Sequence, residues 1–190
     1  MNVFIKLVLK STCLWAALLA LPLGAEPAAL QTCISCHGKN GVGINPEYAN
    51  LGGQHEAYLA LQLHAFRSGE RKNAVMNGMA AALSDADIEE LAAWYAGQEW
   101  ITADNGDASR VERGQNHAGY CHACHGMQGH PVANEWPVIA GQSAPYLENQ
   151  LQGFKSGSRY HPLMVNVVKN LSPEAMKSLA SYYTQVTRED

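Results

Sequence analysis

The sequence predicts an all-α protein built from two tandem domains. The chain repeats itself at a constant offset of 88 residues, with no gap in the match. Apolar residues recur at helical spacing in both halves, and no alternating strand pattern competes with them. Each half also carries one Cys-x-x-Cys-His motif, at residues 33–37 and 121–125. Together these observations indicate a duplicated domain rather than two chance motifs.

The repeat extends far beyond the two motifs. It matches glycines, aromatic residues and polar side chains as well as apolar ones. The matched pairs include Gly53/Gly141, Gln54/Gln142, Tyr58/Tyr146, Gln62/Gln150, Phe66/Phe154, Arg71/Arg159, Leu91/Leu179 and Tyr95/Tyr183.

The first 25 residues differ from the rest of the chain. Lys6 and Lys10 precede an apolar run at 13–21, and a short tail ends at Ala25. This order is typical of a secretory signal peptide, with cleavage after Ala25. Residues 1–25 are therefore predicted to be a signal peptide.

Two other interpretations of this segment stay open. Residues 3–23 are about long enough for an uncleaved membrane anchor, although two lysines interrupt the run. Cys13 is a weaker candidate for lipid attachment, because Lys10 and its neighbours precede the apolar run. Cleavage removes Cys13 and leaves four cysteines, all inside the two motifs. No cysteine is then left over for a disulfide, even though an exported protein could form one.

Each half has its own helical pattern. Leu59, Leu63 and Phe66 form one stripe of a helix predicted over 55–67, which Gly69 ends. A last helix begins after Ser84, whose side chain suits an N-cap, and stops at Gly97. Its counterpart in the second half has Ser172 as the cap and proline at the first helical position.

Residues 98–109 are polar and acidic and contain a predicted turn at 104–107, so they are interpreted as a linker. The predicted domains are then 26–97 and 110–190. The net charge of −4 and the isoelectric point near 6.0 give no reason to expect a nucleic-acid partner.

The two motifs have the spacing of a c-type haem attachment site. Two thiols within one helical turn can each add to a vinyl group at the same edge of the macrocycle, and the next histidine lies under the iron. The residues assigned to two covalent haems are Cys33, Cys36, His37, Cys121, Cys124 and His125.

A low-spin electron-transfer haem also needs a sixth ligand, commonly methionine or histidine. Met76 matches Met164 at the offset of 88 residues, whereas Met79 matches a valine. We therefore predict Met76 and Met164 as the second iron ligands and Met79 as a packing residue. His161 is the alternative in the second half, but it matches an asparagine, and Pro162 suggests an extended segment before the ligand.

The remaining polar residues are not predicted to be iron ligands. Arg71 and Arg159 either pair with haem carboxylates or are surface charges that follow a glycine turn. Simple helix packing is expected for Tyr58, Tyr146, Gln54 and Gln142. Solvated or structurally satisfied side chains are expected for His55, His64, His117, His122 and His130.

With these residues assigned, the chain resembles the dihaem class I cytochromes c of the cytochrome c-four type, over about residues 28–185. The resemblance rests on the paired motifs, the Gly-Gln segments ending at Gln54 and Gln142, the Phe-x-Ser-Gly-x-Arg segments, and the two methionines. It implies two tandem class I cytochrome c domains in a periplasmic electron carrier. It also implies redox partners such as the quinol–cytochrome c reductase complex and a terminal oxidase, in a monomer with little or no membrane contact.

Three other functions stay under consideration. A dihaem subunit of a larger dehydrogenase, such as a flavocytochrome c sulfide dehydrogenase, uses the same two-domain fold and is the main alternative. A dihaem peroxidase needs an open iron position, and the chain is short for that class. A zinc protein is remote, because structural zinc motifs usually lie about 15–20 residues apart.

The sequence departs from the family at two positions. The family usually has a proline twelve residues after the proximal histidine; Pro137 fills this place in the second half, but Ala49 fills it in the first. Gly114, which is expected to pack the leading helix of the second domain on its last helix, matches Glu26. We therefore expect a shortened leading helix and a less rigid first domain.

Overall fold

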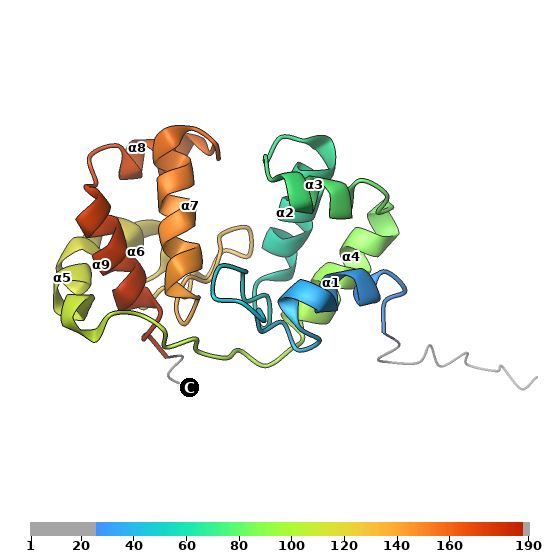
Figure 1. The fold of residues 1–190 in the computed structure, drawn as a ribbon, viewed down its shortest axis with the longest axis horizontal. Helices are drawn as coiled ribbons and strands as arrows, with labels where there is room; N and C mark the ends of the chain where they lie inside the picture. The colour runs from blue at the N-terminus through green and yellow to red at the C-terminus, as the bar shows by residue number, and fades with distance from the viewer. Residues whose placement is uncertain (1–25, 188–190) are drawn as a thin grey trace, which may run out of the picture.

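The computed structural model describes residues 26–187 and is all-helical over them, with two groups of helices joined by an extended segment (Figure 1). The predicted signal peptide, 1–25, lies outside the described residues. Within 26–187, no helix is long and apolar enough to cross a membrane.

The two groups repeat one arrangement of helices. The first group consists of α1 (Leu30–His37), α2 (Glu56–Ser68), α3 (Ala74–Ala80) and α4 (Asp85–Ala96). The second consists of the short 3-10 helix η1 (Ala108–Arg110) followed by α5 (Val111–His117), α6 (Gly119–His125), α7 (Ala144–Ser156), α8 (Pro162–Val168) and α9 (Pro173–Tyr183). Helices α7, α8 and α9 begin 88 residues after α2, α3 and α4, so the sequence repeat is a repeat of structure.

The predicted helix ends are confirmed. Gly69 and Gly157 follow α2 and α7 with φ angles of 77° and 79°, a left-handed conformation that glycine adopts at little cost. The Ser84 side chain accepts a hydrogen bond from the backbone N–H of Asp87, and the Asp87 carboxylate accepts one in return from the backbone N–H of Ser84. Ser172 caps α9 in the same way, through the N–H of Ala175.

Two short helices, α3 and α8, were not predicted. The extended backbone expected at Pro162 is confined to His161, and Pro162 itself lies in the first turn of α8. Proline fits there because its fixed φ suits a helix and its missing N–H has no partner in the first turn. Helices of seven residues are also too short to show a clear apolar period.

Each half has its own hydrophobic core. The core of the first half contains Leu30, Ile88 and Leu91, which are fully or almost fully buried. The core of the second half is centred on Leu179 and Tyr183. A further cluster of Phe154, Val168 and Met176 lies under α8. Each half therefore buries its own apolar helix faces rather than sharing one core.

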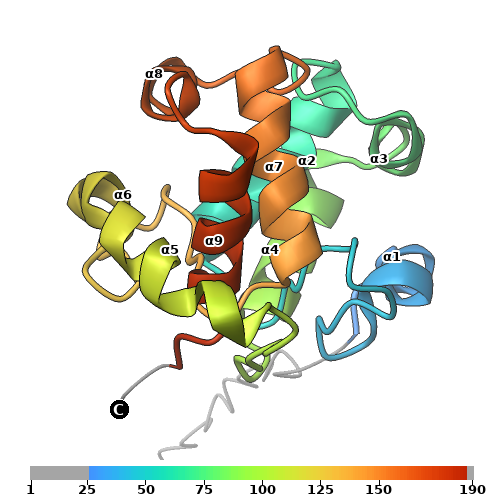
Figure 2. The ribbon, with the colours of Figure 1, turned by 60° about the vertical axis from the view of Figure 1, so that its left-hand side comes forward.

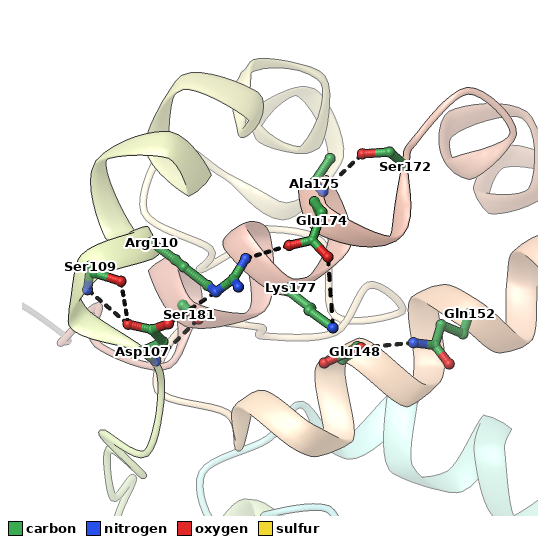
Figure 3. Close-up of polar contacts among 10 residues, drawn as sticks. All are labelled: Asp107, Ser109, Arg110, Glu148, Gln152, Ser172, Glu174, Ala175, Lys177 and Ser181. Carbon is green, nitrogen blue, oxygen red and sulfur yellow. Dashed lines mark hydrogen bonds and ion pairs between the residues drawn. The ribbon is translucent and has the colours of Figure 1, made fainter.

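The second half has a leading helix that is not seen among the described residues of the first half, which begin at Glu26. Helix α5 packs on α9, whereas the described first half begins with non-helical residues and enters α1 at Leu30 (Figure 2). Polar contacts strengthen the packing (Figure 3): the Arg110 guanidinium contacts the carboxylates of Asp107 and Glu174, and the Asp107 N–H donates to Ser181. The predicted shortening of the first leading helix is confirmed.

Gly114 sets how closely α5 and α9 approach. A Cβ atom at this position would lie 2.0 Å from the backbone oxygen of Ser178, which is far inside van der Waals contact. We expect Gly114→Ala to destabilise the second half by about 1–3 kcal/mol, the usual cost of overpacking. Chemical unfolding followed at the haem absorption bands measures the effect. Gly119→Ala is the matched control, because nothing lies within 4 Å of its Cβ position, and an equal loss in both variants would contradict the prediction.

The segment between the halves is fastened to the second one. The Ala103 N–H donates to the backbone oxygen of Gly141 at 2.8 Å, and the Asp104 N–H donates to that of Thr184 at 3.2 Å. Of the predicted turn at 104–107, Asp104 has a positive φ of 43° and Gly106 lies at a bend.

Two glutamines join the halves through buried hydrogen bonds. The Gln54 side chain donates to the backbone oxygen of Val138 and accepts from its N–H, both at 2.9 Å. The Gln142 side chain makes the same two bonds with the backbone of Asn50, both at 2.8 Å. Because Val138 and Asn50 are themselves 88 residues apart, the two contacts are related by approximate twofold symmetry. The expectation of simple helix packing for these glutamines was wrong, because their side chains hydrogen-bond the backbone of the other half.

Candidate haem-binding sites

The haem motifs form the helices α1 and α6. Cys33 and Cys36 lie one turn apart on α1, and His37 is its last residue. Gly38 then turns the chain sharply, with a φ of 68° and a Cβ position only 2.4 Å from the backbone oxygen of Val42. The second half repeats this geometry on α6. A side chain at this turn is excluded, so the backbone of the following loop lies directly against the glycine.

Each motif histidine is held by the loop that follows it. The ring Nδ1 of His37 lies 2.9 Å from the backbone oxygen of Ala49, and that of His125 lies 3.0 Å from the backbone oxygen of Pro137. Nδ1 is therefore the protonated nitrogen in these contacts, and Nε2 keeps its lone pair for a metal. In the first half the carbonyl is in place although Ala49 replaces the usual proline.

Burial keeps these side chains neutral. It lowers the pKa of His37 and His125, and the backbone carbonyls offset this effect only in part. Burial also raises the pKa of the Cys33 and Cys121 thiols. All four motif cysteines are free of disulfides. Neutral imidazoles with an available Nε2, next to unpaired thiols, are the donor set that a covalent haem requires.

The two predicted methionine ligands occupy equivalent places. Met76 is the third residue of α3 and Met164 the third residue of α8, and both side chains are half-buried. Met164 packs against the cluster of Phe154, Val168 and Met176. Met79 is 47% exposed, so the packing role expected for it is not seen, while His161 is the exposed residue before α8.

The arginines of the repeat lie between α2 and α7. Arg71 donates to Gln62 on its own side, and to Tyr146 and Gln150 across the boundary, at 2.7–3.2 Å. Arg159 makes the equivalent set of bonds under the approximate twofold symmetry, with Gln150, Tyr58 and Gln62. Each guanidinium also covers a phenylalanine ring of its own half at 4.4–4.5 Å. These arginines are thus not free surface charges, and Tyr58 and Tyr146 do more than pack within a helix.

This network places two positive charges close together. Both guanidiniums donate to the same two glutamine oxygens. Burial alone would raise the pKa of Tyr146, but the two guanidiniums outweigh it and the pKa is lowered. The cross-boundary contacts were missed because no local pattern reports them; the matched Tyr, Gln and Arg pairs were the available signal.

The fold and the paired motif sites define a dihaem c-type cytochrome. The family model for subunit III of cbb3-type cytochrome c oxidase matches residues 25–94. Cytochrome c4 of Pseudomonas aeruginosa is 30% identical over 172 residues, covering 83% of this chain and 85% of that protein. The crystal structure of reduced cytochrome c4 from Pseudomonas stutzeri superimposes with a TM-score of 0.78 at 29% identity, covering 86% of this chain and all of that one. The chain belongs to the cytochrome c4 family, whose members are electron-transfer proteins.

Other relatives are connected with thiosulfate oxidation. A thiosulfate dehydrogenase electron acceptor of Stutzerimonas stutzeri is 34% identical over 182 residues, covering 88% of this chain and 84% of that protein. A thiosulfate dehydrogenase from Marichromatium purpuratum contains a similar fold, with a TM-score of 0.71 and 30% identity. That match covers 80% of this chain but 36% of the other, so the similar part is one portion of a longer protein.

Proposed function

We propose that the protein is an exported, periplasmic electron carrier that binds two covalent haems, one in each of the domains 26–97 and 110–190. The observation that carries the proposal is the duplicated histidine contact, in which a backbone oxygen twelve residues on holds Nδ1 of His37 and of His125. Haem iron supplies one-electron chemistry when bound, and the protein contributes ligands, a partly buried site and protection from side reactions.

The ligand assignment follows from the repeat. His37 and His125 are the proximal ligands, and Met76 and Met164 are the distal ones, because the methionines occupy the same position of equivalent helices. Two protein ligands at each iron leave no open position for substrate chemistry. The protein therefore passes electrons and does not itself transform a substrate.

A dehydrogenase that oxidises thiosulfate is the proposed donor, and a terminal oxidase the proposed final acceptor. Similarity to thiosulfate dehydrogenase electron acceptors supports the donor. A permanent place in a larger dehydrogenase is the second candidate, favoured by the match to part of a longer thiosulfate dehydrogenase chain. Co-purification of a dehydrogenase subunit at constant ratio distinguishes the second candidate from a free carrier.

The haem content tests the central claim. Pyridine haemochrome analysis of protein purified from the periplasm is expected to give two haems c per chain. Stopped-flow mixing with purified thiosulfate dehydrogenase and thiosulfate is expected to reduce both haems. One haem or none per chain would overturn the two-haem proposal, whereas a fully loaded protein that the dehydrogenase fails to reduce would overturn only the donor.

A further inference from the structure

The exposed apolar residues of the two halves can be compared position by position, because each residue has a counterpart 88 positions away. Two exposed apolar positions are shared: Ile44 and Val75 in the first half match Val132 and Leu163 in the second. All four side chains are at least half exposed. This shared pair is common to both copies of the fold and does not distinguish them.

Three strongly exposed positions are apolar only in the second half. The second half has Tyr120, Met127 and Tyr160, which are 85%, 74% and 71% exposed. The equivalent exposed residues of the first half are threonine and two lysines, at 32, 39 and 72. Tyrosine and methionine are enriched, and lysine is depleted, in the cores of protein interfaces. The apolar side chains exposed only in the first half are less exposed, at 36–50%; they are Val42, Tyr48, Leu61 and Met79. The more strongly exposed set of the second half therefore has the composition of a docking surface.

These side chains flank the second haem motif. Tyr120 lies on α6, immediately before the first motif cysteine, and Met127 follows the helix by two residues. Tyr160 lies between Arg159 and His161, both of which act electrostatically on His125 at the end of α6. In Figure 2, α6 and α8 both lie at the left-hand side of the second group. We define the apolar rim as Tyr120, Met127, Val132, Tyr160 and Leu163.

The charge around the apolar rim is positive. The segments that carry it, residues 119–134 and 149–173, contain two lysines and an arginine but no aspartate or glutamate. The equivalent segments of the first half, 31–46 and 61–85, contain four basic residues and two acidic ones, Glu70 and Asp85, so the larger difference in charge is that between the whole halves. Across the described residues, 110–187 have six basic and four acidic side chains, against four and eight in 26–97. A partner that fits the rim has an apolar centre surrounded by carboxylates.

We propose that the apolar rim is the docking surface for the protein electron donor, so that electrons enter at the second haem and reach the first one afterwards. This inference rests on the proposed function for the existence of a protein donor. An apolar contact without deep burial suits redox encounters, which are small and short-lived. Complementary charge outside the contact acts on the association rate more than on the affinity of the complex.

Neutral substitutions test the rim without altering net charge. We expect Tyr120→Thr/Met127→Gln/Tyr160→Gln to lower the second-order rate constant for reduction by purified thiosulfate dehydrogenase about tenfold or more. The matched control is Ile44→Gln/Val75→Gln, which removes the exposed apolar pair of the first half and is expected to change the rate less than about twofold. All five side chains are exposed, so their replacement should not disturb the cores. Each variant counts as intact if its haem spectrum and its rate of reduction by ascorbate are unchanged.

Substitutions that change charge provide an independent test of the docking surface. Lys169→Glu next to α8 is expected to slow reduction and to weaken its dependence on ionic strength, while Lys72→Glu in the first half leaves both nearly unchanged. Equal rates in the rim variant and the wild type, with the wild type fully reduced by the dehydrogenase, would overturn the docking surface alone. A wild type that the dehydrogenase does not reduce would overturn the proposed donor, and this docking partner with it.

Discussion

Replacing Met164 by alanine is expected to leave the second haem attached but to remove its methionine ligand. In the proposed assignment the covalent links depend on Cys121 and Cys124 and the proximal bond on His125, and this substitution leaves all three residues in place. Met76→Ala should do the same to the first haem. Each single variant is expected to lose about half of the weak charge-transfer band near the red end of the oxidised spectrum, and the double variant all of it.

The reduction potential should fall together with the band. A methionine ligand in a partly dry pocket raises the potential of a haem, and axial ligands as a class span roughly 0.8 V. Loss of the thioether is therefore expected to lower the potential of the affected haem by on the order of 0.1 V or more, with the other haem much less affected. Spectroelectrochemical titration resolves the two haems, and the two single variants assign each potential to its own half.

Matched controls separate ligation from packing. Met79→Ala changes an exposed methionine on the same helix as Met76 and is expected to preserve both bands and both potentials. His161→Ala tests the rival ligand next to α8 and should likewise preserve them. A charge-transfer band of full intensity in the Met76→Ala/Met164→Ala variant would reject the ligand assignment. Loss of the band in His161→Ala would move the second ligand to that residue.

Local chemistry was the part of the structure that the sequence predicted well. Serine caps and glycine ends depend on neighbours within a few residues, so Ser84 and Gly69 were placed correctly from spacing alone. The 88-residue offset also showed that the two halves differ at the positions of Gly114 and Glu26. Gly114 lies at close range to Ser178, whereas its counterpart Glu26 and the described residues that follow it up to Ala29 are not helical. A duplicated chain makes such differences readable because one half serves as the reference for the other.

The contacts between the halves were not predicted, and the reason is physical. A repeat states which residues are equivalent, but it does not state how the two copies are oriented. Gln54, Gln142 and the two arginines looked like residues of their own domain because every sequence neighbour belongs to that domain. Their partners lie 75–101 residues away, beyond the reach of any periodicity. Polar residues that are matched in a repeat and lack a local role deserve to be tested as contacts across its symmetry axis.

The largest effect on the joint between the halves is expected from Gln54→Ala/Gln142→Ala. Each glutamine is 4% exposed and satisfies both backbone groups of a buried residue in the other half. Alanine leaves an N–H and a carbonyl without partners at each site, and an unsatisfied buried group costs about 1–3 kcal/mol. We therefore expect each single variant to weaken the joint by about 2–4 kcal/mol, and the two by similar amounts because their contacts are related by symmetry.

The double variant should change how the protein unfolds as well as how stable it is. Each half keeps its own core, so loss of the joint is expected to turn one calorimetric transition into two, one for each half. The exposed Gln152→Ala is the control, since this side chain contacts only Glu148 one turn away on α7. A double variant that keeps one sharp transition at the temperature of that control would mean that the Arg71 and Arg159 network holds the halves without the glutamines. In that case Arg71→Met/Arg159→Met, and not the glutamine pair, is expected to separate the two transitions.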